Sequence, residues 1–139
     1  MRKQEQKLWD RLSSHMKGMW LAERIESMLA GGVPDVFFTI PQIHGWIELK
    51  VLVAWPKRPT TRVVIEHFTA QQGLWLFQHD KAGGHVWFFL EVAGEHFLIR
   101  GVDAKPLAHG GSGLLPDEVR QLAIWQGKVI DGRAIRCLI

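Results

Sequence analysis

Cysteine and long apolar runs are scarce in this chain, and each shortage excludes a class of protein. The 139 residues hold one cysteine, Cys137, which rules out an internal disulfide and a cysteine-rich zinc site. No apolar run approaches the ~20 residues that a membrane-spanning helix needs. Residues 1–7 are charged and lack the apolar stretch of a signal peptide. We therefore expect a soluble, cytoplasmic protein with no membrane partner.

Several common catalytic motifs are missing as well. The seven histidines form no His-Glu-X-X-His pattern and no paired spacing for zinc. Ser112 lacks the Gly-X-Ser-X-Gly elbow of serine hydrolases. The glycine-rich segment 110–113 is not followed by the Gly-Lys-Ser/Thr of a nucleotide-binding loop. These patterns argue against a zinc hydrolase, a serine hydrolase and a P-loop nucleotide-binding protein.

The overall composition is that of an ordinary globular domain. Apolar residues make up 47% of the chain and charged residues 22%, which gives no sign of bulk disorder. The length fits a single domain that spans residues 1–139. The net charge of +3 is compatible with a polyanionic partner such as nucleic acid but does not require one.

Apolar periodicity and turn residues predict an α/β fold with a central mixed sheet flanked by helices. The expected elements are a helix over 5–29, which Gly18 splits or weakens, strands over 33–40 and 45–53, a short strand over 62–68, a helix over 70–79 with Thr69 as its N-cap, strands over 85–92 and 96–99, and a helix over 115–126. Residues 54–62, with two prolines and three cations, are expected to form an exposed loop.

Charged residues interrupt two of the apolar strands, where they are costly to bury without partners. Side chains alternate faces along a strand, so Glu48 and Lys50 share one face of the 45–53 strand. The opposite, apolar face is expected to hold Ile47, Leu49, Val51 and Val53. If the 33–40 strand pairs alongside, Asp35 projects to the same side as Glu48 and Lys50. The sequence therefore predicts a cluster of two carboxylates and one ammonium above a core.

Such a cluster suits phosphodiester hydrolysis. Mg²⁺ keeps several waters and binds few protein carboxylates, so Asp35 and Glu48 would supply enough oxygen ligands. The ion would polarise a phosphoryl oxygen and lower the pKa of bound water, and Lys50 would orient that water or stabilise charge on the phosphate. The alternative is a solvated sheet face with a weak ion pair, which is common for an isolated Glu-X-Lys.

The two strings Pro34-Asp35 and Glu48-Leu49-Lys50 together resemble the motif of the PD-(D/E)XK nuclease superfamily. The wider segments 24–27, 32–36 and 46–50 look like those of small phage and archaeal Holliday junction resolvases and the related VRR-type nucleases. The resemblance covers about residues 20–80. It implies a restriction-endonuclease-like core, Mg²⁺ with Mn²⁺ as a substitute, DNA as substrate, and a phage or prokaryotic source.

The resemblance also implies further site residues. The family places a metal-binding glutamate on the helix before the Asp strand, and this chain offers Glu26, our first choice, and Glu23. A glutamine often lies on the helix after the core strands, where Gln71 matches best. Gln71 is equally well interpreted as a routine polar residue at a helix start. His44, close to the acidic strand, is a candidate contact for a substrate phosphate.

Cations near these segments are candidates for binding the DNA backbone. The proposed contacts are Lys57, Arg58, Arg62 and Arg24.

The leading hypothesis is a Mg²⁺-dependent endonuclease that resolves four-way DNA junctions as a homodimer. Exposed tryptophans and the apolar hairpin around residues 86–89 are the candidate dimer interface. One alternative is a flap, repair or restriction-type nuclease on the same fold. The other is a DNA-binding subunit without catalysis.

Overall fold

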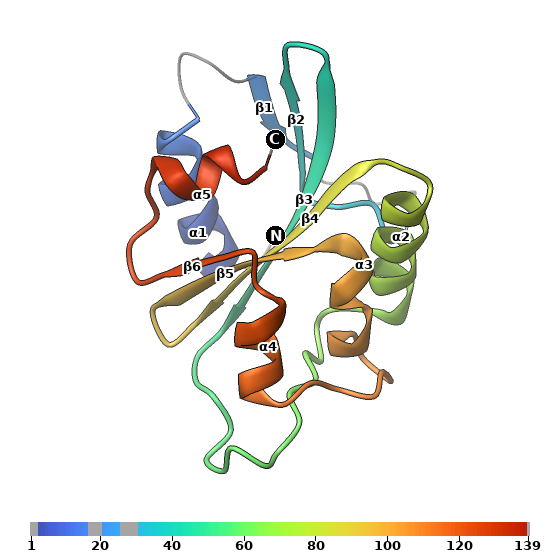
Figure 1. Cartoon of the computed structure of the whole chain (residues 1–139), viewed down its shortest axis with the longest axis vertical. Helices are drawn as coiled ribbons and strands as arrows, with labels where there is room; N and C mark the ends of the chain where they lie inside the picture. The colour runs from blue at the N-terminus through green and yellow to red at the C-terminus, as the bar shows by residue number, and fades with distance from the viewer. Residues whose placement is uncertain (1–2, 17–20, 26–30, 139) are drawn as a thin grey trace.

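The computed structural model describes residues 3–16, 21–25 and 31–138. Within these residues the chain forms one mixed sheet with helices on both faces (Figure 1). The elements in chain order are α1 (Lys3–Ser14), β1 (Leu21–Arg24), β2 (Val36–Ile40), β3 (Ile43–Leu52), α2 (Ala70–Lys81), β4 (His85–Val92), β5 (Glu95–Arg100), α3 (Gly101–Ala104), the 3-10 turn η1 (Lys105–Leu107), α4 (Pro116–Leu122), β6 (Trp125–Gly127) and α5 (Gly132–Arg136).

The strands follow one another across the sheet in the order β1-β2-β3-β4-β5-β6. Neighbouring strands are antiparallel except β3 and β4, which run parallel and are joined by the crossover that contains α2. The predicted α/β class with a central mixed sheet flanked by helices is confirmed.

Two apolar clusters hold the helices onto the sheet. On one face, α2, α3 and α4 pack over a cluster that includes Leu76, Phe88, Phe97, Ala104 and Val119. On the other face, α1 and α5 pack over a cluster that includes Leu8, Leu12, Phe38, Leu49, Phe89 and Ile135. Alternate residues of β4 serve the two clusters, which is why its sequence reads as a continuous apolar run.

Several locally encoded features agree with the sequence. The β2–β3 hairpin turns at Gln42, whose φ is 69°, and the β4–β5 hairpin turns at Ala93 and Gly94 with φ of 51° and 82°. In the β4–β5 hairpin both central residues have positive φ, which matches the twist of a two-residue hairpin. Thr69 caps α2 through its side chain, as predicted.

The predicted helix over 5–29 is wrong in its second half. Helix α1 ends at Ser14, and residues 21–24 form the edge strand β1, antiparallel to β2. Helical spacing in a short apolar stretch does not distinguish a helix from a strand, and here pairing with β2 satisfies the backbone instead. The Ile25 amide also donates to the Asp35 carbonyl, which continues the pairing. Residues 17–20 and 26–30 lie outside the described residues.

Two other expected elements need correction. The predicted strand over 62–68 contains only isolated bridges, Val63 with Leu114 and Ile65 with Ala108, because these residues pair with loop segments rather than with the sheet. The predicted helix over 115–126 ends at Leu122, after which the Ile124 amide donates to the Leu98 carbonyl and β6 covers the edge of β5.

Two expectations about which residues are buried and which are exposed are also wrong. Val53 lies just beyond the end of β3 and is 79% exposed, so the apolar face of that strand ends at Val51. The segment 86–89 was the expected dimer interface. Its residues Val86, Phe88 and Phe89 are buried in the monomer core and are not available to a partner.

Candidate functional site

Asp35 and Glu48 lie beside each other where β2 and β3 pair. The register joins Val36 to Ile47, which sets Asp35 next to Glu48. The Leu49 amide donates a 3.1 Å hydrogen bond to Asp35 Oδ2, so the aspartate is tied to the strand that carries the glutamate. Glu48 is fully buried. Its burial, and next the negative charge of Asp35, raise the pKa of Glu48 well above its usual range, against the opposing effect of Lys50.

Lys50 lies between two glutamates. Its Nζ is 3.3 Å from Glu48 Oε1 and 3.7 Å from Glu5 Oε1, and all three side chains are almost completely buried. His67, in the loop before α2, brings its Nε2 to 3.4 Å from the same Glu5 oxygen. The structure thus places acids from α1 and β3 around one ammonium, with Asp35 beside the second of these acids.

Glu5 is a site residue that the sequence analysis missed. It lies in the first turn of α1, on the buried side of the helix with Leu8 and Leu12. These three positions follow the i, i+3, i+7 spacing of an apolar helix face, so an acid among them was a usable signal. A buried acid on an apolar face needs a partner, and Lys50 supplies it.

Gln72 is the second residue that was missed. Its Nε2 donates to Glu48 Oε1 at 3.3 Å, and its Oε1 accepts from the Thr69 amide at 2.9 Å. The Thr69 hydroxyl accepts in return from the Gln72 amide, which completes a capping box. The spacing Thr-X-X-Gln is a recognisable capping signal and would have singled out Gln72. Gln71, the predicted glutamine, is exposed and packs instead against Gly31 and Gly32.

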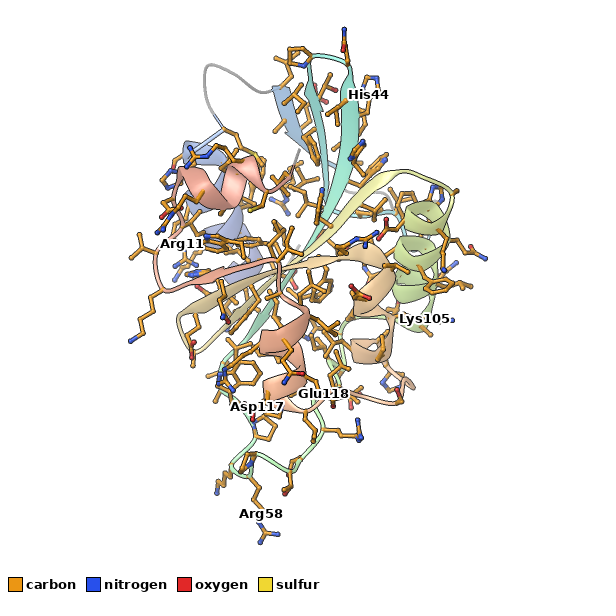
Figure 2. All side chains as sticks on the ribbon, in the orientation of Figure 1. Arg11, His44, Arg58, Lys105, Asp117 and Glu118 are labelled. Atoms are coloured by element: carbon orange, nitrogen blue, oxygen red, sulfur yellow. The ribbon has the colours of Figure 1, made fainter. Side chains whose placement is uncertain are left out.

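The other predicted residues lie at different distances from this cluster. Glu23 lies on the edge strand β1 opposite Phe37 and is exposed, and Arg24 follows it in a partly buried position. Glu26 lies outside the described residues. His44 is exposed on β3, on the face of Glu48 but four residues away, which is about 13 Å along the strand (Figure 2).

The basic loop 53–62 extends from the end of β3 to the lower end of the molecule in Figure 2, where Arg58 is labelled. Lys57 and Arg58 are exposed. Arg62 is engaged with Glu118 at 3.4 Å and with the Gly113 carbonyl at 3.3 Å. The loop therefore presents two cations to solvent close to the strand that carries Glu48.

The donor set fits a hard divalent cation held by few protein ligands. Glu48 Oε2 is buried and accepts no hydrogen bond from a donor among the described residues, beside a second carboxylate. Those residues contain no group of three or more acidic, histidine or cysteine side chains arranged to hold a metal. Two carboxylates are nonetheless enough for Mg²⁺, which retains several waters.

Comparison with known proteins supports the fold assignment. No protein-family model and no curated protein sequence matches the chain. Among solved structures, the chain is similar to Hjc of Archaeoglobus fulgidus, a Holliday junction resolvase from an archaeal hyperthermophile, with a TM-score of 0.57 and 12% sequence identity over 99% of this chain and 100% of that one. No helix in the described part of the chain is long and apolar enough to cross a bilayer. The fold of this chain is therefore similar to that of an archaeal Holliday junction resolvase, as the resemblance noted in the sequence implies.

Proposed function

We propose that this chain is a divalent-metal-dependent DNA endonuclease and, in its most specific form, a Holliday junction resolvase. The observation that carries the proposal is the cluster of the buried Glu48 and Lys50 with the half-buried Asp35 within a resolvase-like fold. Burying adjacent carboxylates is costly, so a fold that keeps them has a use for the charge. A nuclease needs such charge to hold a metal beside a phosphodiester.

Asp35 and Glu48 are the proposed metal ligands. Mg²⁺ bound there, with Mn²⁺ as a substitute, would polarise a phosphoryl oxygen and acidify a water. The third acid of the site is Glu5, which the geometry favours, or Glu26, which the sequence resemblance implies. Comparing cleavage by Glu5→Gln and Glu26→Gln variants decides between them.

Lys50 and Gln72 act on the same centre from the protein side. In hydrolysis a water oxygen bonds to phosphorus, the bond to one sugar oxygen breaks, and that oxygen takes up a proton. The Lys50 ammonium orients the attacking water or binds a phosphate oxygen, where it stabilises the developing negative charge. Gln72 holds Glu48 in place through its 3.3 Å hydrogen bond. Three further residues are proposed to support the metal ligands or to contact the substrate without binding the metal. They are Gln71, Glu23 and His44.

The proposed partner is branched DNA. Lys57 and Arg58 at the exposed loop, with Arg62 and Arg24, would bind backbone phosphates and set the position of the strand. Two symmetric nicks on a four-way junction need two active sites, so we propose a homodimer. A mass of one chain by gel filtration at micromolar concentration would contradict the dimer.

Cleavage of two labelled substrates tests the function. The substrates are a four-way junction and a linear duplex of matching sequence, each incubated with Mg²⁺, with Mn²⁺ or with EDTA. We expect metal-dependent nicking of the junction and little cutting of the duplex. Equal cutting of both would indicate another repair, flap or restriction-type nuclease. Binding without metal-dependent cutting of either would indicate a DNA-binding subunit and contradict the enzyme.

A further inference from the structure

Five aromatic rings form a continuous row whose middle, at Phe37 and Trp46, lies two residues along the strands from the carboxylate pair. We call Phe37, His44, Trp46, Trp75 and His79 the aromatic row. Consecutive centroids lie 6.0 Å apart for His44 and Phe37, 5.0 Å for Phe37 and Trp46, 5.5 Å for Trp46 and Trp75, and 3.6 Å for Trp75 and His79. We propose that the aromatic row stacks against unpaired bases of the DNA strand whose phosphodiester lies at Asp35 and Glu48. This inference rests on the proposed function and names the strand conformation that the site prefers.

The row belongs to the same face as the site. Trp46 and His44 precede Glu48 on β3 by two and four residues and therefore share its face. Phe37 is paired with Trp46 across the hairpin, two residues after Asp35. On α2, Trp75 and His79 follow Gln72 at helical spacing, so each lies about one turn further from the carboxylates. The row thus leads away from the carboxylates in the gap between the hairpin and α2.

The row also reaches solvent. His44 and His79 at its two ends are exposed, and Phe37, Trp46 and Trp75 are half-buried. Figure 2 shows His44 at the upper end of the molecule, near the turn of the β2–β3 hairpin. The nearby acid Asp80 is already engaged by the Val102 amide at 2.7 Å and by Arg100 at 3.8 Å. Rings of this kind offer flat faces to a polyanionic strand without adding an unpaired carboxylate.

Stacking on such rings requires bases that have left the duplex. Paired bases expose only their edges in the grooves, whereas bases of a single strand or a distorted junction offer their π-faces. Along β3, His44 lies about 13 Å from Glu48, so the row covers the surface between the carboxylates and the tip of the hairpin. A site with this surface favours a strand that is unpaired on one side of the phosphodiester to be cut.

Binding in EDTA, where metal-dependent cutting is absent, tests the inference apart from catalysis. The probes are a labelled single strand, a fork with one unpaired arm, and a fully paired duplex of the same sequence. The variants Trp46→Leu and Trp75→Leu should each bind the single strand and the fork about tenfold more weakly, with the duplex unchanged. Trp125→Leu, which removes a half-buried tryptophan from β6, is the matched control and should bind all three probes normally.

Two further measurements keep the test independent of core packing. His44→Ala and His79→Ala change exposed rings only and should weaken single-strand binding several-fold, whereas His15→Ala, an exposed histidine outside the row, should not. The second measurement is the intrinsic fluorescence of the protein, which comes from tryptophan because the chain has no tyrosine. Stacked bases should quench that emission in the parent, and less in Trp46→Leu and Trp75→Leu.

The possible outcomes distinguish failure of the stacking surface from failure of the nuclease proposal. Equal weakening of duplex and single-strand binding, or unchanged binding in all row variants, would overturn the stacking surface and leave the nuclease proposal to its own cleavage test. Selective single-strand binding without metal-dependent cleavage would support the stacking surface and contradict the nuclease. Failure of the parent protein to bind any of the three probes would overturn both.

Discussion

Two polar clusters lie on opposite faces of the same sheet, and their groups are paired to different degrees. On the α1 side, the half-buried Glu91 accepts at Oε1 from the Arg11 guanidinium and lies 3.0 Å from His96 Nε2, and His96 Nδ1 lies 3.1 Å from the Gly127 carbonyl. On the α2 side, Glu48 has a second carboxylate as its neighbour and keeps one oxygen without a donor among the described residues. We call these the Glu91 cluster and the Glu48 cluster.

We interpret the Glu91 cluster as a structural network and the Glu48 cluster as the candidate functional site. The Glu91 cluster ties β4, β5, β6 and α1 together, and each of its polar groups has a partner. In the Glu48 cluster, burial and the charge of Asp35 oppose ionisation of Glu48 more strongly than Lys50 favours it. A buried carboxylate whose surroundings oppose its charge is expected where a ligand completes the site.

The largest expected contrast between the clusters is in catalysis. If the proposed function holds, Asp35→Asn and Glu48→Gln should each lower cleavage at least about 100-fold, since each removes a proposed metal ligand. DNA binding in the absence of metal should persist. Glu91→Gln is the matched control on the opposite face and should retain cleavage within a few-fold. A comparable loss in Glu91→Gln would show that the two clusters are not distinct in role.

The next contrast is in pH dependence. The raised pKa of Glu48 means that the folded protein holds a proton there at pH values where a free glutamate has lost it. A cation must displace that proton, so metal affinity should fall about tenfold per pH unit below the raised pKa and level off above it. Mg²⁺ titrations monitored by cleavage over about pH 5 to 8 measure this. The Glu91→Gln variant should keep the profile of the parent, and a flat profile in the parent would contradict the expectation.

Stability should change in opposite directions in the two clusters. Because burial raises the pKa of Glu48, the folded state binds its proton more tightly than the unfolded state, and stability is lost as pH rises from the ordinary glutamate pKa of 4.5 through the raised pKa. Glu48→Gln should therefore raise the melting temperature by a few degrees at neutral pH, with a smaller gain at acidic pH. Glu91→Gln should cost about 1–3 kcal/mol, because it weakens the hydrogen bonds of His96 and Arg11. Thermal unfolding at two pH values checks both signs, and destabilisation by Glu48→Gln at neutral pH would show that its charge is compensated after all.

The smallest expected effect distinguishes two neighbouring glutamines. Gln72→Leu removes a helix cap and the amide that holds Glu48, so it should cost about 1 kcal/mol of stability and lower cleavage several-fold. Gln71→Leu changes an exposed residue and should leave cleavage nearly unchanged. Initial cleavage rates and melting temperatures of the two variants provide the comparison. The reverse order of effects would favour the glutamine chosen from the sequence resemblance.

Local patterns were sufficient to predict the half of the site that lies on one hairpin. Alternation along 45–53 placed Glu48 and Lys50 on one face, and the turn after Ile40 brought Asp35 beside them. These relations depend on a two-residue period and a short loop, both of which are visible in a single sequence.

Residues that reach the site from distant elements could not be located in the same way. The helical glutamate was sought at 23–26, next to Asp35 in sequence, but residues 21–24 form an edge strand and Glu5 on α1 contacts Lys50. Only tertiary packing brings Glu5 into contact with Lys50, which lies 45 positions later in the sequence, and no periodicity reports such a contact. Likewise, the strand β6 exists because it pairs with β5, whereas its own three residues carry little strand signal.

The parallel pairing of β3 with β4 has a consequence for how the molecule folds. The β2–β3 hairpin joins neighbouring residues and pays little loop-closure entropy, whereas β4 joins β3 only after the long crossover through α2 has closed. Asp35, Glu48 and Lys50 are therefore expected to meet early, in a hairpin still open to water, before Gln72 and His67 arrive with the crossover. The chain can thus bring its acids together while they are hydrated, and the full electrostatic cost of burying them falls in the last stage of folding.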